Sequence, residues 1–140
     1  MEAFLARYVA APRQVLLAQF LRFGAVGAAG FVVDTATVYA TKAELGLYGA
    51  GLLAFFVAAS ANWAMNRAWT FRGLGSGPLH RQWAKFLAVN AIGFVFNRGC
   101  YALLVTFSPL CAENPVLAVA AGAVAGLFSN FALSRRLVFR

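Results

Sequence analysis

The residues of this chain that could do chemistry are charged and carboxamide side chains set in apolar sequence. Asp34 follows Arg22 by about twelve residues, roughly 18 Å along a helix, and Arg98 lies at nearly the same depth in a later apolar segment. An ionised side chain near the centre of a bilayer costs about 2.5 to 3.5 kcal/mol, so we expect Asp34 and Arg98 to pair. Such a pair either fixes helix register or belongs to a polar translocation path.

Five asparagines add hydrogen-bonding groups to the same apolar segments, and they are Asn62, Asn66, Asn90, Asn97 and Asn130. Asn62 and Asn66 are four residues apart, which places them on one face of a helix. A carboxamide both donates and accepts, so these side chains could bind sugar hydroxyls. They could equally join helices to one another, for about 0.6 to 2 kcal/mol each, and for any single Asn that alternative stays open.

A third group consists of cations at the ends of the apolar segments, and its members are Arg22, Arg67, Lys85, Arg135 and Arg136. Arginine presents a planar fork that can hold two phosphate oxygens, and lysine supplies a compact positive charge. We therefore expect these cations to bind the phosphate of a lipid in the cytoplasmic leaflet.

The sequence offers no constellation typical of an enzyme. One histidine and four acidic residues cannot build a nucleophile with its base, and no cluster of His and Cys suits a metal. Cys100 falls inside an apolar segment and Cys111 in the following loop, and both are expected to be packing residues. We predict no catalytic activity, no metal and no cofactor.

Composition decides the class of protein. Of 140 residues, 62% are hydrophobic and 11% charged, and the mean hydropathy is +0.74, which is typical of a membrane protein. The sequence contains four apolar windows, at residues 23–40, 48–65, 86–107 and 115–133. Each window is near the roughly 17 to 25 residues that a spanning helix needs. The sequence thus predicts an all-α protein with four transmembrane helices.

The net charge of +8 indicates the orientation of the protein in the membrane and not binding to nucleic acid, because the cations lie mainly in particular loops. They precede the first window, lie between the second and third, and follow the fourth. By the positive-inside rule both termini and the middle loop are cytoplasmic, while residues 42–48 and 108–114 are on the other side.

The chain also contains an internal repeat. Residues 62–72 (NWAMNRAWTFR) match residues 130–140 (NFALSRRLVFR) at an offset of 68, and residues 19–34 match residues 82–97 at an offset of 63. We call residues related by these offsets matched positions. One membrane domain, residues 1–140, is then predicted as repeat 1 (about 19–72), a Gly/Ser-rich link (73–80) and repeat 2 (about 82–140).

Each predicted repeat holds two spans, so the two repeats are parallel and matched residues lie at matched depths. Gly122 and Gly126 form a GxxxG pair, which lets helices approach closely. We expect this pair to pack helices within the chain, with a homodimer face as the alternative.

The two copies of the Asn-containing motif, together with RFGAVGAAGFVVD at residues 22–34, resemble the GtrA-like family of small four-span membrane proteins over nearly the whole chain from residue 20 onward. The resemblance implies translocation of polyprenyl-phosphate-linked sugars across the bacterial inner membrane for surface polysaccharide synthesis or modification. Membrane lipids and a membrane glycosyltransferase are the other partners it suggests. The second copy departs from the first, with Ser134 in place of Asn66 and Leu137 in place of Trp69.

Two other functions stay open. In one, the protein is a scaffold that holds a polyprenyl-phosphate glycosyltransferase beside its substrate without transporting anything. In the other, Asp34 is the proton-coupled residue of a small exporter. An exporter of that type needs a carboxylate free to titrate, whereas here Arg98 is available to neutralise Asp34.

Overall fold

The computed structural model describes residues 11–140, and the predicted cytoplasmic residues 1–10 lie outside this part. The described residues are all-helical, with no strand among them. The chain divides into two compact units, unit 1 (Met1–Gly75) and unit 2 (Ser76–Arg140).

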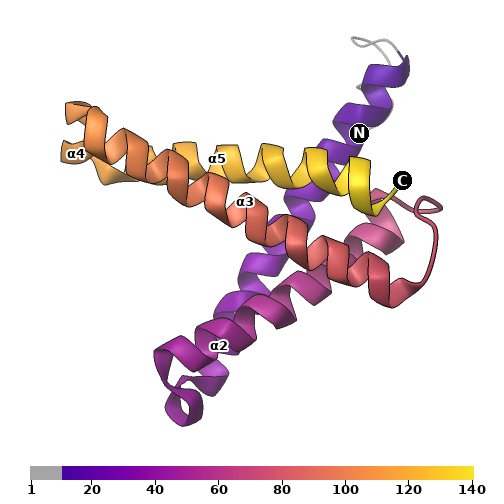
Figure 1. The fold of residues 1–140 in the computed structure, drawn as a ribbon, viewed down its shortest axis with the longest axis horizontal. Helices are drawn as coiled ribbons and strands as arrows, with labels where there is room; N and C mark the ends of the chain where they lie inside the picture. The colour runs from indigo at the N-terminus through magenta and orange to yellow at the C-terminus, as the bar shows by residue number, and fades with distance from the viewer. Residues whose placement is uncertain (1–10) are drawn as a thin grey trace. The chain divides into compact units, whose positions relative to one another are not determined.

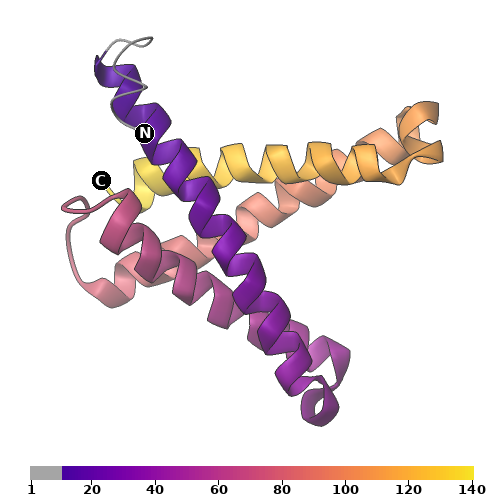
Figure 2. The same ribbon diagram turned by 180° about the vertical axis from the view of Figure 1, so that it is seen from behind.

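Unit 1 is a helical hairpin. Helix α2 (Ala11–Met65) is interrupted at Gly46, whose φ of 70° and ψ of 174° are not helical. Only glycine adopts such a conformation readily, so the chain reverses there and the second arm of α2 returns beside the first (Figures 1 and 2). A π-helical turn, η1 (Asn66–Thr70), ends the second arm. The loop predicted at residues 42–48 is therefore mostly helix, with a turn at Gly46.

Unit 2 is a second hairpin, made by α3 (Leu79–Phe107) and α5 (Pro115–Leu133). A short helix, α4 (Pro109–Glu113), joins them, and its first turn is capped by the Ser108 hydroxyl, which accepts from the Cys111 backbone N–H. Asn114 precedes α5 and Pro115 is its first residue, where the missing N–H of proline costs no hydrogen bond. A second π-helical turn, η2 (Ser134–Val138), follows α5.

The link between the units contains three glycines with positive φ, at Gly73 (79°), Gly75 (95°) and Gly77 (83°). Residues other than glycine rarely adopt a positive φ. The link is therefore rich in glycine because its backbone conformation requires it. Helix α3 begins at Leu79, directly after Pro78.

Within residues 11–140, three helices are long and apolar enough to cross a membrane, namely Pro12–Thr70, Leu79–Phe107 and Pro115–Val138. Their outer faces carry large exposed apolar side chains such as Phe31 (71% exposed) and Val116 (70% exposed). A soluble protein rarely exposes so much contiguous apolar surface, whereas lipid tails accommodate it. The chain is a membrane protein.

The GxxxG pair packs inside unit 2. A Cβ at Gly122 would lie 2.6 Å from the Asn97 carbonyl oxygen, and one at Gly126 would lie 3.1 Å from the Asn97 Cβ. Helices α3 and α5 therefore approach closely because these two residues have no side chains. The expectation that Gly122 and Gly126 pack helices within the chain is confirmed.

Candidate functional site

Each hairpin holds an asparagine against a glycine of the facing helix. In unit 1 the Asn62 carboxamide contacts the position that a Gly30 Cβ would occupy, and in unit 2 the Asn130 carboxamide does the same at Gly93. Asn62 and Asn130 are matched positions, and so are Gly30 and Gly93. The glycine thus opens a space in the helix interface, and a polar side chain fills it.

Buried oxygen atoms without hydrogen-bond partners cluster along the same helix faces. Among the described residues they are Asn62 Oδ1, Asn66 Oδ1, Thr70 Oγ1, Asn130 Oδ1 and Ser134 Oγ. Asn66 is only 1% exposed, and its matched residue Ser134 is fully buried. A buried polar atom left unpaired costs about 1 to 3 kcal/mol, so these oxygens are polar groups that the packing of the hairpins leaves unsatisfied.

Three of these polar residues, Asn66, Thr70 and Ser134, lie within the π-helical turns. In η1 the Phe71 N–H donates to the Asn66 carbonyl at 2.8 Å, and in η2 the Phe139 N–H donates to the Ser134 carbonyl at 3.0 Å. Such turns occur often at functional sites. A buried Gln82 adds support in unit 2, because its Nε2 donates a long hydrogen bond (3.5 Å) to the Val138 carbonyl.

Each π turn places a phenylalanine in the hairpin core. Phe71 meets Phe23 edge to face at 6.2 Å between ring centres, and Phe139 meets Phe86 in the same way at 6.0 Å. All four rings are buried. Aromatic pairs of this geometry contribute about 0.5 to 1.5 kcal/mol beyond their buried area, so they fix the end of each hairpin where the cations lie.

The predicted phosphate-binding cations have different surroundings. The Arg22 guanidinium carbon lies 5.8 Å from the centre of the Trp69 ring, within the range of a cation–π contact. Arg67 is half-buried, Arg135 is exposed, and both take part in other contacts. Arg136 and Lys85 are exposed. Of the predicted cations, Lys85 is the one that lines a described pocket.

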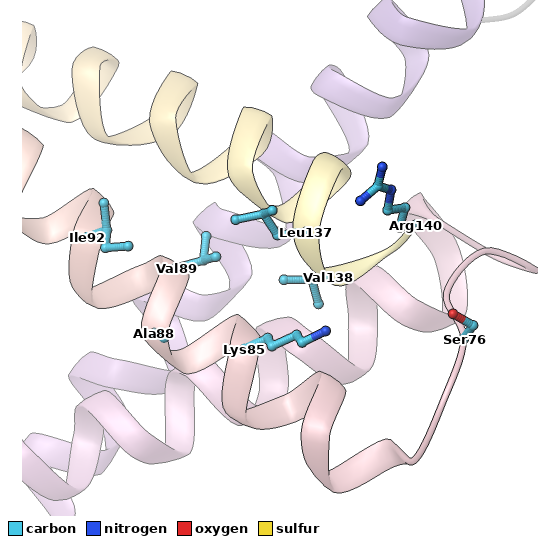
Figure 3. A pocket seen from close by; sticks show the side chains of 8 residues that line it. All are labelled: Ser76, Lys85, Ala88, Val89, Ile92, Leu137, Val138 and Arg140. Atoms are coloured by element: carbon cyan, nitrogen blue, oxygen red, sulfur yellow. The ribbon is translucent and has the colours of Figure 1, made fainter.

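That pocket has a volume of about 390 Å³ and lies at the end of unit 2 where α3 meets η2 (Figure 3). Lys85 from α3 and Arg140, after η2, supply positive charge. The other lining residues are mostly apolar, and they are Ser76, Ala88, Val89, Ile92, Leu137 and Val138. The pocket therefore combines cations with an apolar wall, as a lipid phosphate requires.

A family comparison accounts for this architecture. The model of the GtrA/DPMS transmembrane domain family matches residues 22–139, which is most of the chain. The chain belongs to this family. The match includes every predicted site residue and the whole of both hairpins except the first turns of α2. A search of curated proteins gave no significant match.

Within this GtrA/DPMS domain, other predicted path residues lie apart from the unpaired oxygens. The Asn90 Nδ2 donates to the Phe86 carbonyl at 2.9 Å on its own helix, and Asn97 packs against the α5 glycines. The Arg98 guanidinium carbon lies 5.4 Å from the Phe94 ring centre. Asp34 belongs to unit 1 and Arg98 to unit 2, so their pairing stays a prediction.

Sequence reasoning missed three features of the GtrA/DPMS site, namely Thr70, Ser134 and Arg140. In sequence Ser134 is a departure from Asn66, yet its hydroxyl keeps an acceptor at the matched position. Arg140 ends the second copy of the motif and is matched to Arg72, which ends the first copy. This match between the two copies could have identified Arg140 as a candidate residue. Among the described residues no group of His, Cys, Asp and Glu could hold a metal ion.

Proposed function

We propose that this GtrA/DPMS domain translocates a polyprenyl-phosphate-linked sugar across the bacterial inner membrane, for the synthesis or modification of surface polysaccharide. The family match supports a role in polyprenyl-linked sugar pathways. We further infer that the domain translocates this lipid without any catalytic step.

The proposal includes four membrane crossings with both termini in the cytoplasm. A bilayer core of about 30 Å needs about 20 helical residues, and Pro12–Thr70 has 59. The turn at Gly46 divides that helix into two arms, each long enough to cross once. With α3 and α5 the chain then crosses four times, as two parallel hairpins.

The observation that carries the proposal is the set of unpaired buried oxygens at matched positions in both hairpins. Asn62 with Asn66 in unit 1 and Asn130 with Ser134 in unit 2 present acceptors within apolar helices. A sugar leaving water loses its hydrogen bonds, at a cost of several kcal/mol for each unpaired polar group. Acceptors that are already desolvated and unpaired can replace some of those bonds.

Cations lie one position beyond the inner acceptors. Arg67 follows Asn66 and Arg135 follows Ser134, each inside a π turn. A lipid-linked sugar carries its phosphate between the sugar and the prenyl chain, so cations beside the acceptors match the order of groups in such a ligand. The prenyl chain can remain in the surrounding lipid.

Reconstitution tests the proposal. The purified full-length chain is placed in liposomes that carry a fluorescent polyprenyl-phosphate sugar, and the fraction accessible to an external quencher or glycosidase is followed over time. We expect exchange between leaflets well above that of protein-free liposomes. Exchange equal to that background, with the chain folded and inserted, would favour the scaffold function. Exchange that occurs only with an imposed proton gradient, and equally for unrelated amphiphiles, would favour a proton-coupled exporter.

A further inference from the structure

The two hairpins differ at two matched positions, one a predicted phosphate-binding cation and the other an apolar residue of the π turn. Unit 1 has Trp69 where unit 2 has Leu137, and Arg22 where unit 2 has Lys85. In unit 1 the cation lies against the indole, 5.8 Å from the ring centre. In unit 2 both residues line the 390 Å³ pocket (Figure 3).

The chemistry of this pocket identifies one class of ligand. Lys85 and Arg140 supply two positive charges from different parts of the hairpin, and the Ser76 hydroxyl can donate a hydrogen bond. Val89 is buried and Ile92 is partly exposed along the α3 side, which gives an apolar wall leading away from the charges. A phosphate group with an attached hydrocarbon chain satisfies both parts, whereas a free phosphate uses only the first.

We propose that each chain binds a single isoprenoid lipid phosphate, and that it does so in the unit 2 pocket. In unit 1 the Trp69 indole occupies the space beside Arg22. In unit 2 the smaller Leu137 side chain leaves the corresponding space beside Lys85 open. The Arg22 guanidinium is stabilised by that ring, and moving it onto a phosphate would forfeit the cation–π contact. This inference rests on the proposed function for its ligand class, and it specifies which hairpin holds the headgroup.

Binding stoichiometry and a swap of the matched residues test the inference. The full chain in detergent is titrated with geranylgeranyl phosphate, and bound lipid is counted by native mass spectrometry. We expect one bound lipid per chain. Leu137→Trp fills the pocket and Lys85→Gln removes its charge, so each should weaken binding about tenfold or more, the size expected for a lost charge-assisted hydrogen bond. Lys85 is exposed, so its variant is not expected to disturb folding.

The control variant is Trp69→Leu, the reverse change at the matched position, which should leave the affinity of the unit 2 site within about twofold. Inorganic phosphate and geranylgeraniol, which each carry half of the ligand, should both bind at least tenfold more weakly than geranylgeranyl phosphate. If inorganic phosphate binds as tightly as geranylgeranyl phosphate, the pocket is a site for free phosphate and the lipid assignment is overturned.

Two results would overturn the choice of hairpin. One is unchanged binding in both Leu137→Trp and Lys85→Gln, and the other is an equal loss in Trp69→Leu. Binding and transport are measured separately, so the two proposals fail separately. Single-site binding without leaflet exchange would reject translocation alone, and exchange with binding untouched by the unit 2 variants would reject the pocket alone.

Discussion

The contact between Asn130 and Gly93 predicts a large effect from adding one methyl group. In a Gly93→Ala variant the three atoms nearest the new Cβ are Oδ1, Cγ and Nδ2 of Asn130. All three lie too close for a methyl group, so α3 and α5 must separate or the carboxamide must leave its position. The same overlap exists between Gly30 and Asn62 in unit 1.

The expected loss of stability in Gly93→Ala is the difference between two opposing effects. Overpacking a tight interface costs about 1 to 3 kcal/mol, and replacing glycine by alanine in a helix returns up to about 1 kcal/mol. Gly99 lies on the same helix, and a Cβ added there would have nothing within 4 Å. Gly99→Ala therefore gains the helix propensity of alanine without overpacking. Gly93→Ala should therefore be about 1 to 3 kcal/mol less stable than Gly99→Ala.

A second substitution identifies the cause. Asn130→Ala removes all three overlapping atoms, so the Gly93→Ala and Asn130→Ala double variant should recover most of the loss. Stability is measured by titrating sodium dodecyl sulfate into mixed micelles and following the far-ultraviolet circular dichroism. The reasoning is refuted if Gly93→Ala is as stable as Gly99→Ala, or if the double variant is no more stable than Gly93→Ala alone.

Three further predictions concern topology, charge pairing and phosphate recognition. Ser76→Cys in a cysteine-free background should react with an impermeant thiol reagent only from the cytoplasmic side, and labelling from outside intact cells would show the inverted orientation. Asp34→Asn and Arg98→Gln should each impair transport, with the double variant less impaired than additivity implies, because each single change strands a charged partner in the low dielectric of the membrane; strict additivity would count against the pair. Arg67→Lys and Arg135→Lys keep the topology charge but lose the planar fork, so leaflet exchange of a polyprenyl-phosphate sugar should slow about tenfold, and unchanged exchange would make these arginines topology determinants only.

Hydropathy located the helices of unit 2 and three of their four ends. The windows 86–107 and 115–133 correspond to α3 (Leu79–Phe107) and α5 (Pro115–Leu133), yet α3 begins seven residues before its window. Those residues are polar enough to fall outside an apolar window while still helical. For the same reason Lys42 and Glu44 suggested a loop where the chain is helical, and the turn is made by Gly46, whose backbone freedom hydropathy does not record.

The repeat revealed half of the candidate site. It identified Asn62 with Asn130 and Gly30 with Gly93 as matched positions, but their contact needs the geometry of the hairpin. The π turns could not be predicted from periodicity, because a π turn adds a residue and rotates everything after it by roughly 100°. That rotation explains why Phe71, at a boundary position in the sequence, has a ring that is completely buried.

On the proposed function, the buried unpaired oxygens serve a translocated sugar and not the stability of the fold. Asn66→Ala tests it most directly, since alanine removes an acceptor that has no partner among the described residues and adds no volume at a position that is 1% exposed. Removing an unpaired buried polar group also removes its desolvation cost of about 1 to 3 kcal/mol, which offsets the small cavity that alanine leaves, so the variant should be about as stable as the natural chain. The measurement is the rate of leaflet exchange of a polyprenyl-phosphate sugar in liposomes. We predict a fall of about tenfold or more with stability retained, whereas an unchanged rate, or a fall that merely follows unfolding, would contradict the claim.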